Sequence, residues 1–159
     1  MRITLLAVGK IKEKYLADAV AEYSKRLGRY AKLSIVEADD EKTPENASPK
    51  EEEAIKAREG ARLLAKIPAD AYVIALAIEG KQPDSVELSE HIRQLALSGR
   101  SHLAFLIGGS LGLSREVLER ADEKLSFSRL TFPHQLMRVI LLEQIYRSFR
   151  IARNEPYHK

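Results

Sequence analysis

The residues best suited to hold a small ligand lie between Ser101 and His134. The glycine-rich stretch Gly108-Gly109-Ser110-Leu111-Gly112 follows an apolar run of the strand type, and a long loop, 127–134, follows a second such run. Ligands of open α/β sheets bind outside the carboxyl ends of strands, where glycine lets the backbone come close and N–H groups stay unpaired. The stretch therefore predicts a small-molecule site. A simple tight turn explains the glycines equally well when they are taken alone, and the two loop phenylalanines could be core residues.

The glycine spacing narrows the class of ligand. It matches neither G-x-G-x-x-G nor a P-loop with its lysine and hydroxyl, so dinucleotides and nucleoside triphosphates lose support. A ligand whose adenine and ribose are held by backbone groups fits the pattern better. The mixture of aromatic, hydroxyl and basic groups in 127–134 suits a loop that covers such a ligand.

Ionisable groups gather in and after the last predicted helix. At 100° per residue, Arg138 falls on the apolar stripe of that helix. Its guanidinium could snorkel to solvent, but we favour a role in binding phosphate or stabilising an anion. The tail Pro156-Tyr157-His158-Lys159 offers an aromatic ring, an imidazole and a cation, at a terminus where disorder is the usual expectation. His91 and His102 lie within helix and strand patterns, and we interpret both as structural or surface residues.

The elements that must position these groups alternate along the chain. Short apolar runs predict strands over 2–8, 33–36, 71–78, 102–107 and 124–127. Periodic or capped segments predict helices over 15–27, from Ser48-Pro49 onward, and over 86–98, 114–121 and 134–153. Such alternation predicts an α/β fold with a mostly parallel sheet and helices on both faces. We expect 37–48 to be a mobile loop and 79–81 to leave the third strand. No linker or repeat interrupts residues 1–159, so a single domain is expected.

Composition excludes several classes of protein. The chain is 45% hydrophobic and 31% charged, without the roughly 18-residue apolar run of a membrane span. It also lacks the pattern of a signal peptide, so a cytoplasmic location is expected. There is no cysteine, and the four histidines show no H-x-x-x-H spacing, so neither a disulfide nor a metal site is expected.

The charge is small overall but unevenly distributed. The net charge is +3, with eight basic and three acidic residues in 1–32 and with nine acidic and four basic residues in 37–60. Basic segments brought together in space would attract a nucleic acid. The simpler explanation of these basic segments is that they are solvated helix faces, and on charge alone we favour this explanation.

Four ordered motifs resemble a known family. They are L-I-G-G-S-L-G-L-S (106–114), L-S-F-S-R-L-T-F-P-H-Q-L-M-R (125–138), L-L-E-Q-I-Y-R (141–147) and the P-Y-H-K terminus. Together with the G-K-I-K start, they make the whole chain similar to the RlmH family of SPOUT methyltransferases. The resemblance implies S-adenosylmethionine-dependent methylation of N3 of a pseudouridine in large-subunit ribosomal RNA by a homodimer. It also implies a carboxyl-terminal trefoil knot, which general topology rules would exclude.

The resemblance also assigns site residues. The family's cofactor positions fall on Leu76, Gly108 and the loop Phe127, Ser128, Arg129, Leu130, Thr131 and Phe132. Its RNA-facing positions fall on His134, Arg138, Tyr157, His158 and Lys159. One departure is Ala77, where relatives commonly have Asp, which places a hydrogen bond of that loop in doubt.

The implied chemistry gives the last residues their expected roles. A sulfonium methyl is already electrophilic, so the protein must align it with N3 and ease removal of the imide proton. Histidine, with a pKa of about 6.5, can accept a proton, so we assign His158 as base or substrate-positioning group. Arg138 is expected to stabilise developing charge or grip phosphate, and Tyr157 to stack on a base. Because the net charge is small, assembled ribosomes are the expected substrate.

Three other functions remain compatible with the sequence. The chain could be a SPOUT enzyme with another RNA target, such as transfer RNA. It could be a ribosome-binding factor without turnover, which Ala77 faintly permits. An unrelated nucleotide-binding regulator ranks last, because the phosphate cradle is absent.

Overall fold

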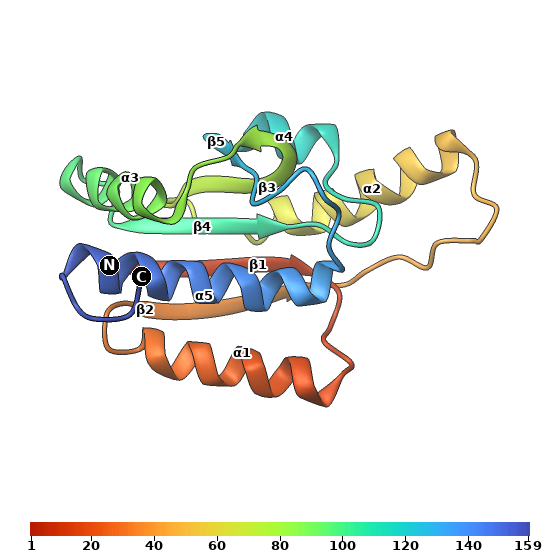
Figure 1. The fold of residues 1–159 in the computed structure, drawn as a ribbon. Helices are drawn as coiled ribbons and strands as arrows, with labels where there is room; N and C mark the ends of the chain where they lie inside the picture. The colour runs from red at the N-terminus through yellow and green to blue at the C-terminus, as the bar shows by residue number, and fades with distance from the viewer.

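The computed structural model describes residues 1–159 and contains one five-stranded parallel sheet. Its strands are β1 (Arg2–Val8), β2 (Lys32–Ala38), β3 (Tyr72–Lys81), β4 (His102–Ile107) and β5 (Glu123–Leu125). The spatial order is β2-β1-β4-β3-β5, and every neighbouring pair is parallel (Figure 1). All strands therefore end at the same edge of the sheet. The predicted parallel α/β sheet is confirmed.

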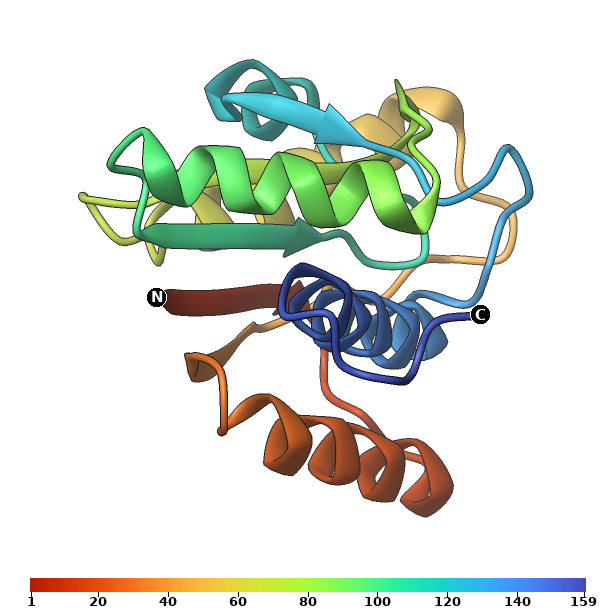
Figure 2. The same cartoon turned by 60° about the vertical axis from the view of Figure 1, so that its left-hand side comes forward.

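Helices cover both faces of this sheet. The helices are α1 (Lys14–Leu27), α2 (Pro49–Leu64), α3 (Ser85–Leu97), α4 (Arg115–Arg120) and α5 (His134–Ala152). Figures 1 and 2 show α1, α3 and α5 on one face, with α2 and α4 on the other. None of the helices is long and apolar enough to cross a membrane.

The two faces follow from the alternation of side chains along the strands. Ile3, Leu5 and Ala7 of β1 pack under α1, α3 and α5, whereas Leu6 and Val8 pack under α2 and α4. Because both faces are covered, the central strands are apolar at nearly every position. That is the continuous apolar pattern seen in the sequence.

The helix ends follow the predicted capping chemistry. Ser48 forms a capping box with Glu51, and the Ser114 side chain accepts a hydrogen bond from the backbone N–H of Val117. Asn154 follows the carboxyl end of α5 with a φ of 53°, the left-handed backbone that asparagine tolerates. This turn sends the last five residues away from the helix axis.

Three predicted boundaries were wrong. β2 continues to Ala38, which shortens the loop to 39–47. β3 does not end before Glu79, because a register shift lets Lys81 pair with Leu125. This close pairing requires glycine, since a Cβ on Gly80 would lie 2.7 Å from the Leu125 backbone nitrogen. β5 in turn ends at Leu125 rather than Phe127, and Ser126 donates its backbone N–H to the Lys81 carbonyl at 2.8 Å.

A buried polar network closes the opposite, amino-terminal edge of the sheet. His102 of β4 is buried, with Nδ1 2.9 Å from Asp70 Oδ1 and Nε2 2.8 Å from Thr4 Oγ1. Arg2 also pairs with Asp70. His91 instead lies 2.8 Å from Glu123 on the surface. Both histidines thus have carboxylate partners, consistent with structural roles.

Candidate functional site

A cavity of about 850 Å³ opens at the carboxyl edge of the sheet. Three chain segments form it: the end of β3, the bend after β4, and the loop that joins β5 to α5. In Figure 1 this loop runs from the end of β5 across the edge of the sheet to the start of α5. The volume of the cavity lies in the usual range for small-molecule and cofactor sites.

Most of the residues predicted to bind the cofactor line this cavity. They are Leu76, Gly108, Phe127, Ser128, Leu130, Thr131 and Phe132. Arg129 is the exception, because its side chain is exposed and lies outside the cavity. A charged side chain in the middle of an exposed loop keeps its hydration by pointing to solvent. The prediction for Arg129 therefore has no support in the geometry.

The glycine bend forms one wall of the cavity by close backbone packing. A Cβ on Gly108 would lie 2.5 Å from the Gly112 carbonyl carbon, and Gly112 has a φ of +91°. Gly109 and Gly112 also form an isolated antiparallel bridge. The bend therefore needs glycine for its own shape, and the same shape leaves backbone exposed to the cavity.

The walls are mainly apolar, with few charges. Aliphatic and aromatic side chains supply most of the lining, including Ile107, Leu118, Leu125 and Met137. The ionisable side chains in the lining are those of Lys56, Glu79 and His134. No group of basic residues is placed to hold a polyphosphate. Ala77, the departure from the family pattern, also lies in this lining.

His134 stands where the cavity meets α5. Burial is the main cause that lowers the pKa of His134, and the nearby charge of Arg138 lowers it further, against a smaller opposing effect of Asp40. Its imidazole is therefore neutral at physiological pH, and it can both donate and accept hydrogen bonds.

Arg138 has a structural role that differs from the predicted one. It is only 2% exposed, and its Nη1 lies 2.6 Å from Glu37 Oε2. Its Nη2 donates to the carbonyl oxygen of Gly9 at 2.7 Å and lies 3.3 Å from that of Val8. From the second turn of α5 the Arg138 side chain reaches the ends of β1 and β2, so both Nη atoms are committed to the backbone there and to Glu37, while Nε is buried without a partner. The prediction that Arg138 grips phosphate or stabilises substrate charge finds no support here.

The carboxyl-terminal tail is ordered against α5 rather than free. The Tyr157 hydroxyl donates to Glu143 Oε1 at 3.0 Å, and its ring packs edge-on against Tyr146 with centroids 5.0 Å apart. Arg147 also pairs with Glu143 at 2.6 Å, and its guanidinium carbon lies 4.7 Å from the centre of the Tyr157 ring. Burial and then the bond to Glu143 raise the pKa of Tyr157 to about 12, so it stays protonated. Glu143 thus holds the tail in place through Tyr157 and Arg147. In the sequence, the i,i+4 spacing of Glu143 and Arg147 was the signal that could have indicated this ion pair.

His158 contacts this cluster through one ring nitrogen. Arg147 Nη1 lies 3.1 Å from His158 Nδ1. A guanidinium can only donate hydrogen bonds, so Nδ1 accepts and the proton of the neutral ring is assigned to Nε2. The exposed nitrogen of His158 is therefore a donor in this arrangement, which favours a substrate-positioning role over the role of a base.

The tail and the cavity lie far apart in one chain. Arg147, against which the tail packs, is ten residues after Met137, the last residue of α5 in the cavity lining, which is roughly 15 Å along the helix axis at 1.5 Å per residue. Lys159 is exposed beyond it. A single chain therefore brings the predicted cofactor residues together with His134 but not with Tyr157, His158 and Lys159.

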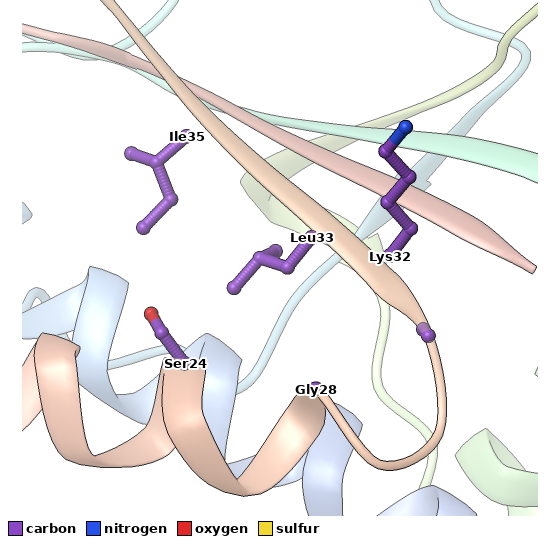
Figure 3. Close-up of a pocket in the computed structure, with 6 residues that line it drawn as sticks. Ser24, Gly28, Lys32, Leu33 and Ile35 are labelled. Carbon is purple, nitrogen blue, oxygen red and sulfur yellow. The ribbon is translucent and has the colours of Figure 1, made fainter.

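A second hollow lies between α1 and β2 and is not a candidate for this chemistry. It measures about 640 Å³ and is lined by Ser24, Gly28, Ala31, Lys32, Leu33 and Ile35 (Figure 3). Only one ionisable side chain borders it, and it contains none of the predicted site residues. No group of three or more His, Asp or Glu side chains is placed to hold a metal ion.

The sheet and the cavity together define a class of protein. A parallel α/β sheet with a glycine bend and a mainly apolar cavity at its carboxyl edge is the architecture of a ligand-binding α/β domain, and the cavity offers no group of basic side chains for phosphate. The family model described as "Predicted SPOUT methyltransferase" matches residues 1–158. The chain belongs to this family of SPOUT methyltransferases, which confirms the resemblance seen in the sequence.

Close relatives cover the whole chain. Three proteins called "Ribosomal RNA large subunit methyltransferase H" align with all 159 residues and over their own full length. They come from Bifidobacterium adolescentis, Clostridium novyi and Carboxydothermus hydrogenoformans, at 65%, 62% and 61% identity.

Solved structures share the fold at low identity. A probable methyltransferase from Bordetella pertussis has a TM-score of 0.56 at 15% identity, over 92% of this chain and 95% of its own. The tRNA (m1G37) methyltransferase from Aquifex aeolicus has a TM-score of 0.51 at 11% identity, over 92% of this chain and 70% of its own.

Proposed function

We propose that this protein transfers a methyl group from S-adenosylmethionine to N3 of a pseudouridine in the RNA of the large ribosomal subunit. The observation that carries the proposal is the cavity at the carboxyl edge, which is lined by seven of the eight residues predicted to bind the cofactor. The full-length relatives named as ribosomal RNA large subunit methyltransferases support the choice of substrate.

The residues that line the cavity fit S-adenosylmethionine. Apolar side chains such as Leu76 and Phe132 suit an adenine ring, and the exposed backbone of the Gly108–Gly112 bend suits polar edges of the base and ribose. The lack of a basic cradle suits a cofactor without phosphate. When bound, this cofactor supplies an electrophilic methyl group on sulfur.

The residues of the chain then have to orient the base and help its imide proton to leave. The exposed Nε2–H of His158 can donate to a carbonyl oxygen of the target base, which stabilises the negative charge that develops as N3 loses its proton. Tyr157, held by Glu143, keeps the tail in a fixed position beside α5. His134 and Lys159 are expected to contact the RNA.

We further propose that the working form is a homodimer. In one chain Arg147, which contacts His158, is separated from the cavity by roughly 15 Å of α5. Two copies with α5 in opposite directions would bring the tail of one beside the cavity of the other, as a two-fold axis requires. The assembled ribosome, in the cytoplasm, is the proposed setting, because a chain of net charge +3 has little electrostatic affinity for free RNA.

Methyl transfer to ribosomes that lack the modification tests this proposal. With radiolabelled S-adenosylmethionine, we expect label in large-subunit RNA, at N3 of a pseudouridine when the nucleoside is mapped. A His158→Ala variant should bind the cofactor normally and transfer methyl groups at least about a hundredfold more slowly, by analogy with the loss of a charge-stabilising donor. Label in transfer RNA alone, or failure of the protein to bind the cofactor, would overturn the proposal.

A further inference from the structure

Glu59 is a buried carboxyl group that lies directly behind the glycine bend of the cavity. It comes from α2 and is only 4% exposed. A Cβ on Gly109 would lie 3.1 Å from Glu59 Oε1 and 3.3 Å from Oε2, so the carboxyl group contacts one side of the Gly109 backbone. Gly109 itself is part of the cavity lining. The bend is therefore a single layer of backbone between Glu59 and the cavity.

The same carboxyl group also holds a second loop. Glu59 Oε2 accepts a hydrogen bond from the backbone N–H of Glu41 at 3.0 Å, whereas Oε1 is buried without a partner. The Glu41 side chain is in turn held by Arg58 at 2.7 Å and by Arg62 at 3.0 Å, both from α2. Glu59 thus connects α2, the 39–47 loop and the glycine bend at one point.

The surroundings of Glu59 favour its uncharged form. Burial is the main cause that raises the pKa of Glu59, and the negative charges of Asp40 and Glu41 raise it further. The Glu41 N–H and the charge of Arg62 oppose this shift. Val8 and Gly109, which also pack against the carboxyl group, carry no charge. An uncharged carboxyl group tolerates an oxygen without a partner far better than a carboxylate does.

We propose that Glu59 is a positioning residue for the cofactor, and that its carboxyl group fixes the Gly108–Gly112 bend in the shape that lines the cavity. It acts through the bend and does not contact the ligand. The identity of the ligand rests on the proposed function, but the support of the bend by Glu59 does not. Glu59 supports Gly109 through packing, together with Val8, while its hydrogen bond to the Glu41 N–H holds the carboxyl group in place.

A double-mutant cycle between Glu59→Ala and Gly109→Ala tests the proposal. The φ of Gly109 is not in the left-handed region, so alanine at this position causes no backbone strain. The added methyl group therefore acts only through its contacts with Glu59 and Val8. Each single variant should weaken S-adenosylmethionine binding about tenfold in calorimetry. The double variant should also be weakened about tenfold, because removal of the Glu59 side chain opens space on one side of the methyl group, into which it can shift away from Val8 Cγ1 at 3.2 Å. Independent effects would multiply to about a hundredfold and would overturn the proposal.

Two further variants separate positioning from general stability. Glu59→Gln keeps the shape of the side chain and an acceptor for the Glu41 N–H, so its affinity at neutral pH should stay within about threefold of the parent. We expect the parent to lose affinity as rising pH ionises Glu59, and Glu59→Gln should not show this loss. Glu52→Gln, on the same helix and without an ion-pair partner, should change nothing. An equal pH profile for the parent and Glu59→Gln would contradict the role of the carboxyl group.

Hydrogen exchange distinguishes failure of this inference from failure of the proposed function. In the ligand-free chain, amides of the bend should exchange faster in Glu59→Ala than in Glu52→Gln. If the parent binds no S-adenosylmethionine but the bend still loosens, the positioning role stands and the ligand is wrong. If the parent binds the cofactor and neither exchange nor affinity changes in Glu59→Ala, the positioning role is wrong.

Discussion

Individual side chains divide into those that shape the cavity and those that hold its surroundings in place. Arg138 shows why this division is hard to see in a sequence. An arginine on an apolar helix stripe suggested a ligand contact, yet its partners are Glu37 and the carbonyl groups at the end of β1. Those partners lie about a hundred residues earlier in the chain, so no local pattern could have identified them. Glu59 was missed for the same reason.

Replacing Arg138 tests its structural role. Arg138→Met removes a guanidinium that is 2% exposed and leaves the Glu37 carboxylate and two carbonyl groups without their donor. We expect a loss of about 3 kcal/mol in the free energy of unfolding, the scale for breaking a buried pair. Urea denaturation measures it. A variant as stable as the parent but defective in methyl transfer would instead indicate that Arg138 contacts the substrate.

Removing the Tyr157 hydroxyl tests whether its hydrogen bond to Glu143 holds the tail in its active position. Tyr157→Phe keeps the ring against Tyr146 but loses the bond to Glu143, which is worth about 1.5 kcal/mol for a charged acceptor. We expect slower methyl transfer at an unchanged affinity for S-adenosylmethionine. Tyr15→Phe, at a side chain that is 70% exposed, is the matched control. Equal rates for both variants would show that the hydroxyl does not hold the tail in its active position.

At the scale of elements, the alternation of strands and helices could be predicted from the sequence, whereas the residues at which distant elements contact each other could not. Apolar period and capping residues located eight of the ten elements to within about two residues at both ends, and α2 at its start. The exception was β3, whose last residues are polar and were assigned to a loop. Their pairing with β5 depends on Gly80 lying against the Leu125 backbone, a contact between distant segments that leaves no periodic trace.

A methyl group at Gly80 should therefore disturb the edge of the cavity. In Gly80→Ala the new Cβ would lie 2.7 Å from backbone atoms of Lys124 and Leu125, which cannot rotate away. We expect β5 to shift and the affinity for S-adenosylmethionine to fall about tenfold, the scale of 1.4 kcal/mol. Gly28→Ala is the control, because its nearest neighbour would lie at 3.3 Å and its backbone is helical. Equal affinity in both variants would show that the β3–β5 pairing does not shape the cavity.

The network at the opposite edge of the sheet predicts a dependence of stability on pH. Hydrogen bonds from His102 and then Arg2 lower the pKa of Asp70. A carboxyl group with a lowered folded-state pKa stabilises the fold above its unfolded pKa, and this contribution is lost as pH falls through the folded value. Asp70→Asn should thus be less stable than the parent at pH 7, and the two should converge in acid. A difference that stays constant down to pH 2 would exclude this linkage, and Asp18→Asn, in an exposed pair with Lys14, should show little difference at any pH.

At the scale of the whole molecule, the site is divided between two places. The carboxyl edge of the sheet holds the cavity, and the tail packs further along α5, with His158 at Arg147, roughly 15 Å from the last cavity residue of the helix. The residues of both places could be predicted from the sequence through the family resemblance, because motifs keep their order in the chain. Only the folded chain gives the distance between them, and this distance is the basis of the proposed homodimer.

Complementation between two inactive variants tests this account most directly. Gly108→Ala should abolish cofactor binding, because its Cβ would lie 2.5 Å from the Gly112 backbone, and His158→Ala should remove the tail donor. Each variant alone should be inactive on ribosomes. After the two are unfolded and refolded together, half of the dimers should be mixed, and each mixed dimer should carry one intact site, which restores about a quarter of the parent activity. No activity in the mixture, with each variant folded and dimeric, would contradict a site built from the cavity of one chain and the tail of the other.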